Sequence, residues 1–229
     1  MMRSSVKSNP VLFWLWYHLY RKHRGVRVNW FKKESSFYFD GFPRSGNTFG
    51  IFLIRSIWPQ LHVVHHLHAV APIKIALKRK LPVFILFRDP LNAISSYYLK
   101  HFALRGRAPA DDALDQTLLQ MLISDYIQYY QYVNDNRNRV NLFTFGMITK
   151  SPAEVMKNIN SKLPERAMLN DATIEAKVNE LKDKPFGAKD KLGASFPTVE
   201  KEIKKKKVIV FLQNHPDFQK CQSLYQNLA

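Results

Sequence analysis

The sequence is poor in cysteine, in acidic residues and in long apolar runs. Cys221 is the single cysteine among 229 residues, so an intrachain disulfide is impossible and a zinc site cannot be built from cysteines. The apolar run from Val11 to Tyr20 spans ten residues, interrupted by His18, whereas a helix needs about 20 residues to cross a bilayer. These shortages exclude a disulfide-stapled fold, a cysteine zinc finger and a membrane span built on this run.

Basic residues outnumber acidic ones almost two to one. Lys and Arg together number 35 against 18 Asp and Glu, which gives a net charge of +17. Such an excess favours polyanionic partners: nucleic acid, an acidic membrane surface, or phosphorylated and acidic small molecules. Hydrophobic residues make up 46% and charged residues 23%, which is typical of a globular protein rather than a disordered one.

Basic residues also enclose the N-terminal apolar run. Lys7 precedes it and the sequence RKHRG follows it at residues 21–25, where a secretory signal would carry small residues for cleavage. Two interpretations stay open: a helix packed on the domain, or an aromatic helix that lies in the surface of an anionic membrane through residues 11–27. We expect an aromatic, basic segment over 1–33, a main domain over 34–229, and a cytoplasmic protein with or without peripheral membrane association.

Short apolar runs alternate with longer helical patterns along the chain. The predicted strands are Phe37–Phe39, Val63–Val64, Val83–Phe87 and Val140–Phe145. The predicted helices are Asn47–Trp58, Val70–Lys80, Leu91–Phe102, Ala113–Val133, Pro152–Ser161 and Phe218–Leu228. Alternation of this kind is typical of parallel strands joined by crossover helices. The sequence thus predicts an α/β fold: a P-loop-like parallel sheet with helices on both faces, in a single domain.

The segment 181–197 differs from the rest of the chain in composition. Lys, Gly and Pro are frequent there and hydrophobic periodicity is poor, which predicts a surface loop. Such a loop either covers a site as a lid or is simply solvated. The run Lys204–Lys207 that follows is interpreted as a solvated face.

Residues 41–48 read GFPRSGNT and follow the first predicted strand. Their glycines stand where the pattern G-x-x-x-x-G-K-[ST] has them, and a helix follows, so backbone amides of the loop would point at an anion. Thr48 supplies the hydroxyl of that pattern, but Asn47 replaces its lysine, which normally reaches the outer phosphates of a nucleoside triphosphate. The loop predicts a phosphate site. Because the lysine is missing, the identity of the phosphate compound that binds there stays open.

Two further polar clusters follow the next two predicted strands. The sequence HHLH occupies residues 65–68, and Arg88 ends the third strand with Ser96 about two helical turns later, where both could bind one phosphate. Because ligands of open parallel sheets sit at the carboxyl ends of the strands, we expect the three clusters to form one site. His65 is expected to point to the opposite face of its strand from His66, as a structural histidine.

Together these motifs resemble those of the sulfotransferases that use 3′-phosphoadenosine 5′-phosphosulfate (PAPS). Their first motif, P-K-S-G-T-T-W, is similar to PRSGNTF at residues 43–49. Their second motif, R-x7-S followed by aromatic residues, matches Arg88 to Ser96 and the two tyrosines after it. A short histidine element between the two motifs corresponds to residues 65–68. The resemblance extends over residues 37–100.

The resemblance implies roles for the residues of both motifs. It implies that the loop binds the 5′-phosphosulfate through five successive residues, Arg44, Ser45, Gly46, Asn47 and Thr48, and that Phe49, in the place of the family's tryptophan, also belongs to the cofactor site. Arg88 and Ser96 would bind the 3′-phosphate, which distinguishes PAPS from ATP. Arg44 stands in the place of the family's lysine and would stabilise charge on the leaving 5′-phosphate. The co-product is adenosine 3′,5′-bisphosphate, and no metal ion is required.

The base that takes the acceptor's proton is implied to be a histidine, which titrates near neutral pH. The family's element K-T-H aligns here with either 64–66 or 66–68, so the base is either His66 or His68. The second alignment is preferred because it keeps a basic residue, His66, at the lysine position. The acceptor is expected to be a hydroxyl or an amine, and glycan, lipid and small-molecule acceptors all stay open.

Two other functions compete with this interpretation. A P-loop kinase or NTPase is disfavoured by Asn47 and by the lack of a clear magnesium site, because Asp89 is the only acid expected at an early strand end and it stands in the sequence Arg-Asp-Pro instead. A non-catalytic basic module that binds a membrane surface or nucleic acid is favoured by the net charge and the N-terminal segment. The presence of both Arg88 and Ser96 argues against it, and nucleic acid is not expected as a partner.

Overall fold

The computed structural model describes residues 4–22, 29–103, 114–182 and 199–229. By their internal contacts the residues group into two compact units, one formed by 1–87 with 135–184 and the other by 88–134 with 185–229. From residue 183 on, the predicted surface loop lies outside the described residues. Within the described ranges, no helix combines the length and the apolar character needed to cross a membrane.

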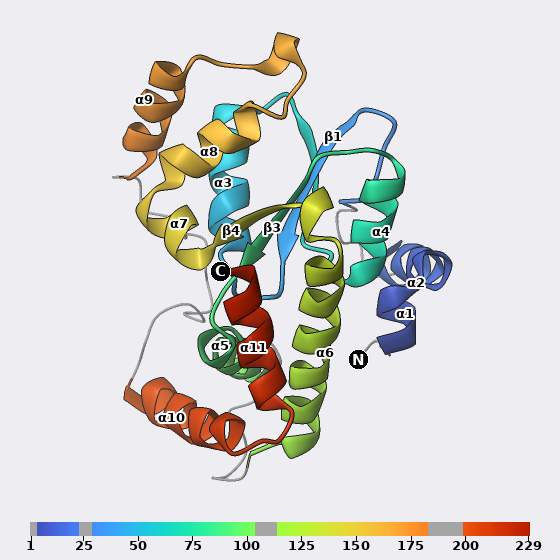
Figure 1. Cartoon of the computed structure of the whole chain (residues 1–229), viewed down its shortest axis with the longest axis vertical. Coiled ribbons are helices and arrows are strands. Elements are labelled where there is room, and N and C mark those ends of the chain that lie inside the picture. Colours follow the sequence, from blue (N-terminus) through green and yellow to red (C-terminus); the bar gives the residue numbers. More distant parts are fainter. Residues whose placement is uncertain (1–3, 23–28, 104–113, 183–198) are drawn as a thin grey trace. The chain divides into compact units, whose positions relative to one another are not determined.

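The first unit is built on a parallel sheet of four strands in the order β2-β1-β3-β4 (Figure 1). The strands are β1 (Ser35–Gly41), β2 (His62–His65), β3 (Val83–Phe87) and β4 (Asn141–Thr144). All three neighbouring pairs are parallel, with Phe39 opposite His65 and Gly41 opposite Leu86. The predicted parallel α/β sheet is therefore confirmed.

Burial explains why these short apolar runs become strands. Every residue of β3 is buried, as expected for a strand covered on both faces by helices. The bounds predicted for β3 are confirmed at both ends. The fourth strand was predicted to reach Phe145, but it ends at Thr144, because the Thr144 side chain accepts a hydrogen bond from the Met147 backbone amide and caps the helix α7 (Phe145–Lys150).

Helices cover both faces of the sheet (Figure 1). On one face, alternate residues of the strands pack into a core with the helices α3 (Asn47–Ile57), α8 (Pro152–Asn160) and α9 (Asp171–Lys182), and the strand residues of this core include Phe37, Phe39, Phe84, Leu86 and Phe143. On the other face, α4 (Val70–Lys78) contacts β1 and β3. The prediction of helices on both faces is confirmed.

Two N-terminal helices, α1 (Ser4–Ser8) and α2 (Pro10–Lys22), pack against α4. Lys74 of α4 donates a hydrogen bond to the Ser8 carbonyl at 3.0 Å. Phe13 and Tyr17 of α2 are buried, and the Tyr17 ring lies 4.9 Å from the ring of Trp30. One face of the apolar run is therefore packed on the first unit, and the predicted boundary at residue 33 stays a prediction.

The opposite face of α2 is apolar and exposed. Its exposed large side chains are 42 to 66% accessible and are Val11, Leu12, Trp14, Leu15 and Leu19. Helices on soluble proteins usually turn polar residues to water, so an exposed apolar face of this size indicates a binding surface. The packed face of α2 fits the first interpretation of the N-terminal run, and the membrane contact stays a prediction.

The second unit consists of the helices α5 (Pro90–Ala103), α6 (Gln116–Asp135), α10 (Val199–Gln213) and α11 (Phe218–Leu228). Asp115 caps α6 by accepting a hydrogen bond from the Leu118 amide at 2.8 Å, which explains why that helix begins at Gln116. The helices α9 and α10 were not predicted. Their lysine- and glutamate-rich sequences carry little hydrophobic periodicity. These helices are therefore evident from the packing in the structure and not from the sequence pattern.

Candidate functional site

The candidate site lies at the carboxyl ends of the strands in the first unit. The chain leaves β1 toward β2 on one side and returns to β3 on the other, so β1 and β3 flank the point where the strand order reverses. Ligands of open α/β sheets bind at such a point. The loop from Phe42 to Gly46 follows β1, and the turn from His66 to Ala69 follows β2, the neighbouring strand.

Two glycines give the loop after β1 its path. A Cβ on Gly41 would lie 2.1 Å from the Leu86 carbonyl oxygen, so only glycine fits where β1 passes β3. Gly46 has a φ of 97°, in the left-handed region, at the N-cap of α3. Arg44 also has a positive φ, of 72°. Left-handed residues close together in a loop turn successive N–H groups inward, and such a concavity binds anions.

Asn47, the residue in the lysine position, is used inside the loop. Its side-chain amide is buried and donates hydrogen bonds to the backbone carbonyls of Gly41 at 3.3 Å and Phe42 at 3.1 Å. Ser45 is also buried, and its amide donates to the Phe42 carbonyl at 3.2 Å. The side chain that would reach the outer phosphates of a triphosphate is therefore replaced by one that fixes the loop's shape.

Asp40, the residue before the loop, is fully buried and was missed by sequence reasoning. Its Oδ2 accepts hydrogen bonds from the Tyr38 hydroxyl at 3.0 Å and from the backbone amides of Leu67 and His68 at 2.7 and 2.8 Å. Its Oδ1 accepts from the Gly41 amide at 2.9 Å. Asp89 was therefore not the only acid at an early strand end. The cue was an aspartate inside an apolar strand, which is buried only with partners.

The fifth partner of Asp40 is the side chain of His68. Nδ1 of His68 lies 2.8 Å from Asp40 Oδ1 and 2.7 Å from the Gly41 carbonyl oxygen. Both of these atoms are acceptors, so Nδ1 carries the proton, and the neutral ring has its lone pair on Nε2. A histidine held in this tautomer by a buried carboxylate can take up a proton at Nε2 and be stabilised when charged.

The charge of Asp40 is stabilised despite its burial. Burial by itself would raise the pKa of the carboxyl, but the attraction of the protonated form of His68 and the hydrogen bonds from its ring and backbone outweigh that effect. The pKa of Asp40 is therefore held far below its usual range. A permanent carboxylate thus lies behind His68 at every physiological pH.

His65 and His66 do not point to opposite faces of the strand, which corrects the expectation. Their Nδ1 atoms lie 2.5 Å apart. The reason is that His66 follows the last residue of β2 and adopts a left-handed conformation with a φ of 56°, which ends the alternation of the strand. His65 is buried, as predicted for a structural histidine, and its Nε2 lies 2.8 Å from an Nη2 of Arg55.

Two other loop residues differ in their surroundings. Thr48 is exposed at the first turn of α3, and its Oγ1 lies 3.4 Å from Nε2 of His66. Phe49 is partly buried and packs against the sheet core on the side of α3. The first unit thus brings together Arg44 to Thr48, His66 and His68 around the end of β1, with Phe49 at the core.

Arg88 and Ser96 belong to the second unit. The Arg88 carbonyl accepts a hydrogen bond from the Tyr126 hydroxyl at 2.9 Å, and Ser96 lies within α5. Asp89 accepts hydrogen bonds from the Asn92 backbone and side chain, both at 3.0 Å, and so caps α5. The expected convergence of Arg88 and Ser96 with the loop on one ligand stays a prediction.

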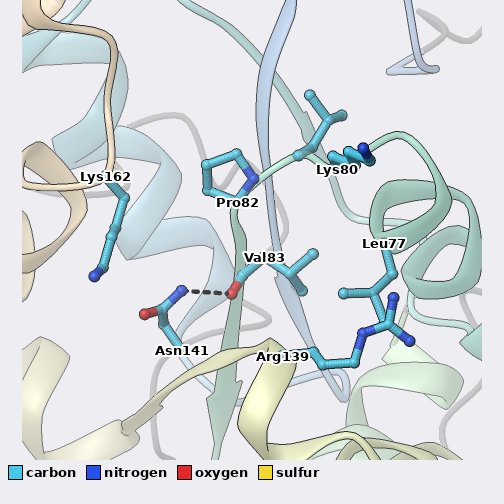
Figure 2. A pocket seen from close by; sticks show the side chains of 8 residues that line it. Leu77, Lys80, Pro82, Val83, Arg139, Asn141 and Lys162 are labelled. Carbon is cyan, nitrogen blue, oxygen red and sulfur yellow. Dashed lines mark hydrogen bonds between the residues drawn. The ribbon is translucent and has the colours of Figure 1, made fainter.

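A separate hollow of about 400 Å³ lies at the opposite, amino ends of β3 and β4 (Figure 2). Asn141 and Val83 both line this hollow, and the Asn141 side chain donates a hydrogen bond to the Val83 carbonyl at 3.1 Å. Lys80, Arg139 and Lys162 also line it, but none of the predicted site residues does. Among the residues described, no group of three or more His, Cys, Asp or Glu side chains is arranged to hold a metal ion.

Comparison with known proteins finds likeness in structure but not in sequence. No family model matches the chain, and no curated protein matches it by sequence. The chain is similar in structure to mouse sulfotransferase SULT7A1, whose crystal structure is a complex with PAP, with a TM-score of 0.46, 12% sequence identity, and 86% of this chain and 90% of that chain covered. At this distance, a function has to be argued from the residues of the site themselves.

The buried His65 should make the first unit sensitive to mild acid. Burial, with help from the nearby His66 and Arg55, lowers the pKa of His65 to about 3. The unfolded chain binds this proton near pH 6.5, so the contribution of a neutral His65 to stability is complete above that pH and is lost progressively as the pH falls toward 3. Between pH 7 and 5.5, His65 alone should lower the free energy of unfolding by about 1 kcal/mol.

Urea unfolding at both pH values, followed by circular dichroism, measures this loss. The variant His65→Gln removes the titrating ring and should show a pH dependence that is smaller than that of the wild type by about 1 kcal/mol. An identical pH dependence in the two proteins would show that His65 is not held neutral in the fold.

Proposed function

We propose that the protein is a sulfotransferase that moves the sulfuryl group of PAPS to an acceptor hydroxyl or amine. The observation that carries the proposal is the position of His68. Its Nδ1 lies 2.8 Å from the buried Asp40 and 2.7 Å from the carbonyl of Gly41, the residue where the anion-binding loop begins. An oriented base thus lies directly beside a site for a phosphate group, as transfer from a phosphate-linked donor requires.

The loop supports a donor with one phosphate at this position rather than a triphosphate tail. Arg44 and Gly46 adopt left-handed conformations, and Asn47 ties the loop to its own carbonyls. Backbone amides of the loop and of the first turn of α3 would bind the 5′-phosphosulfate, with Ser45 and Thr48 beside them. Phe49 follows in α3, where it supports the loop from the core side.

The roles of the side chains follow from the chemistry of the transfer. His68 Nε2 takes the proton of the acceptor hydroxyl as its oxygen forms a bond to sulfur. The bond between sulfur and the bridging oxygen breaks, and that oxygen leaves with its electron pair as part of adenosine 3′,5′-bisphosphate. In the proposal, Arg44 is the cation that stabilises the charge developing there. Asp40 stabilises the imidazolium that His68 becomes.

A P-loop kinase or NTPase fits these residues less well. The amide of Asn47 is occupied within the loop and cannot replace the lysine that reaches a γ-phosphate. Asp40 stands at the end of β1, but its two oxygens accept five hydrogen bonds and serve His68. In the proposal, specificity for PAPS comes instead from Arg88 and Ser96, which would bind the 3′-phosphate.

Nucleotide binding tests this function without knowledge of the acceptor. Adenosine 3′,5′-bisphosphate should raise the melting temperature in the absence of metal, and ATP with Mg²⁺ should raise it much less. The variant Arg88→Ala should weaken binding of the bisphosphate about 10- to 100-fold, because a charged hydrogen bond is lost, and should leave the affinity for adenosine 5′-monophosphate unchanged.

Arg139→Ala is the matched control. It removes the same charge from the first unit at the amino ends of the strands, and it should keep the wild-type affinity. Equal stabilisation by the bisphosphate and by ATP with Mg²⁺ would contradict the PAPS proposal, and an unchanged 3′-phosphate preference in Arg88→Ala would remove that residue from the site.

We also propose that this enzyme works in the cytoplasm at the surface of an anionic membrane, with α2 as its contact. The exposed face of α2 carries five large apolar side chains, among them Trp14 and Leu19. Lys7 precedes the helix, and the basic sequence RKHR begins at residue 21, in the last turn of the helix. An apolar helix face enclosed by basic residues fits the boundary between acyl chains and anionic headgroups, where both the burial and the charge attraction are favourable.

Vesicle sedimentation tests this contact. The full-length chain should bind vesicles of phosphatidylcholine with phosphatidylserine, bind weakly to phosphatidylcholine alone, and dissociate in high salt. The triple variant L12S/L15S/L19S should lose binding, whereas I203S/V210S, which removes comparably exposed apolar side chains from α10, should retain it. Equal binding by both variants, or a dimer in sedimentation equilibrium that only the triple variant breaks, would contradict the membrane contact.

A further inference from the structure

A chain of four side chains connects α3 to the turn after β2. Arg55 Nη2 lies 2.8 Å from His65 Nε2, His65 Nδ1 lies 2.5 Å from His66 Nδ1, and His66 Nε2 lies 3.4 Å from Thr48 Oγ1. The chain begins at an arginine near the end of α3 and returns to a threonine at the start of the same helix. It therefore ends beside the anion-binding loop.

The arginine fixes the proton of the first histidine. A guanidinium only donates hydrogen bonds, so Nε2 of His65 must accept and carry no proton. The ring is also neutral, since burial lowers the pKa of His65 to about 3. A neutral imidazole has one proton, and for His65 it must lie on Nδ1, the nitrogen that faces His66.

The first histidine in turn fixes the second. The Nδ1–H of His65 faces Nδ1 of His66 at 2.5 Å, where a second proton would collide, so Nδ1 of His66 accepts and its proton lies on Nε2. His68 is held in the opposite tautomer, with its proton on Nδ1 toward Asp40. The two rings lie 5.5 Å apart between centroids. His68 therefore offers a lone pair at Nε2, and His66 offers an N–H at Nε2.

The backbone supports the assignment of different roles to His66 and His68. His66 and His68 have φ values of 56° and 47°, a conformation that costs a residue other than glycine about 1 kcal/mol or more. It persists because Asp40 accepts hydrogen bonds from the amides of Leu67 and His68. Strained residues held by a buried partner are typical of sites in which side-chain direction matters.

We propose that Arg55 and His65 are positioning residues that hold His66 with its proton on Nε2, so that His66 donates a hydrogen bond to an anionic oxygen of the group bound at the loop. Its present acceptor, Thr48 Oγ1, lies at the outer limit for a hydrogen bond, and a charged oxygen is a stronger acceptor. The identity of this bound group rests on the proposed function. In that function, the anionic oxygen belongs to the sulfuryl group. His66 is then an electrostatic catalyst and His68 the base.

Nitrogen NMR of ¹⁵N-histidine-labelled protein tests the assignment without any substrate. The ring nitrogens report which atom carries the proton, and the variants His65→Gln, His66→Gln and His68→Gln identify the signals. At neutral pH, His66 should show a protonated Nε2 and His68 a protonated Nδ1. A protonated Nδ1 on His66, or a single averaged tautomer mixture for it, would overturn the proposal.

Arg55→Leu tests the positioning role. Loss of the guanidinium releases Nε2 of His65, so both His65 and His66 should become tautomer mixtures, and Arg55→Lys, which still donates, should restore the wild-type pattern. Arg79→Leu is the control, since Arg79 is an exposed arginine that contacts the Phe31 ring instead. Unchanged His66 signals in Arg55→Leu would overturn the positioning role.

Activity separates this inference from the function. With PAPS and a working acceptor, Arg55→Leu should lower kcat about 10-fold or more at nearly unchanged KM, because the N–H acts in the transition state. Equal losses in the Arg55→Lys and Arg55→Leu variants would reject the tautomer as the cause. If the NMR pattern holds but adenosine 3′,5′-bisphosphate does not bind, the proposed function fails while the assigned N–H at His66 stands.

Discussion

The buried carboxylate of Asp40 is the interaction on which the candidate site depends. It stands near the end of β1 and joins two separate pieces of backbone: the end of that strand at Gly41, where the loop begins, and the turn through Leu67 and His68 after β2. A buried carboxylate without partners would be costly, and five hydrogen bonds offset that cost here. The same carboxylate that holds the loops together also sets the proton of His68.

This arrangement gives the missing lysine a physical explanation. In a triphosphate loop the residue after the second glycine reaches outward to the ligand, whereas Asn47 turns inward and bonds to Gly41 and Phe42. The loop thereby gains a fixed shape, and the side chain at this position does not extend toward outer phosphates. In the proposed function, Arg44 stabilises the charge on the leaving oxygen, His68 takes the proton, and His66, in the opposite tautomer, donates a hydrogen bond. These roles suit the proposed transfer of one group from a single phosphate.

The sequence was sufficient to predict the parallel sheet and the loop, because apolar runs and glycines act locally. It could not predict that Asp40 meets His68, since that contact joins residues 28 positions apart, one in β1 and the other in the turn after β2. The expectation that His65 and His66 point to opposite faces of the strand was wrong, because the left-handed conformation of His66 ends the strand's alternation. The helix α10 was not predicted because Lys204–Lys207 was interpreted as a solvated face. The apolar contacts of this helix come from tertiary packing, in which Val208 and Leu212 are buried.

The most direct test of this account is the turnover of Asp40→Asn. Asparagine keeps the size of the side chain but removes the charge that fixes the tautomer of His68 and stabilises it when protonated. With PAPS and an acceptor found by screening, kcat should fall about 10³-fold or more while the Kd for adenosine 3′,5′-bisphosphate changes by about 3-fold or less, which also shows that the variant is folded. Wild-type turnover in a folded Asp40→Asn protein would contradict the account.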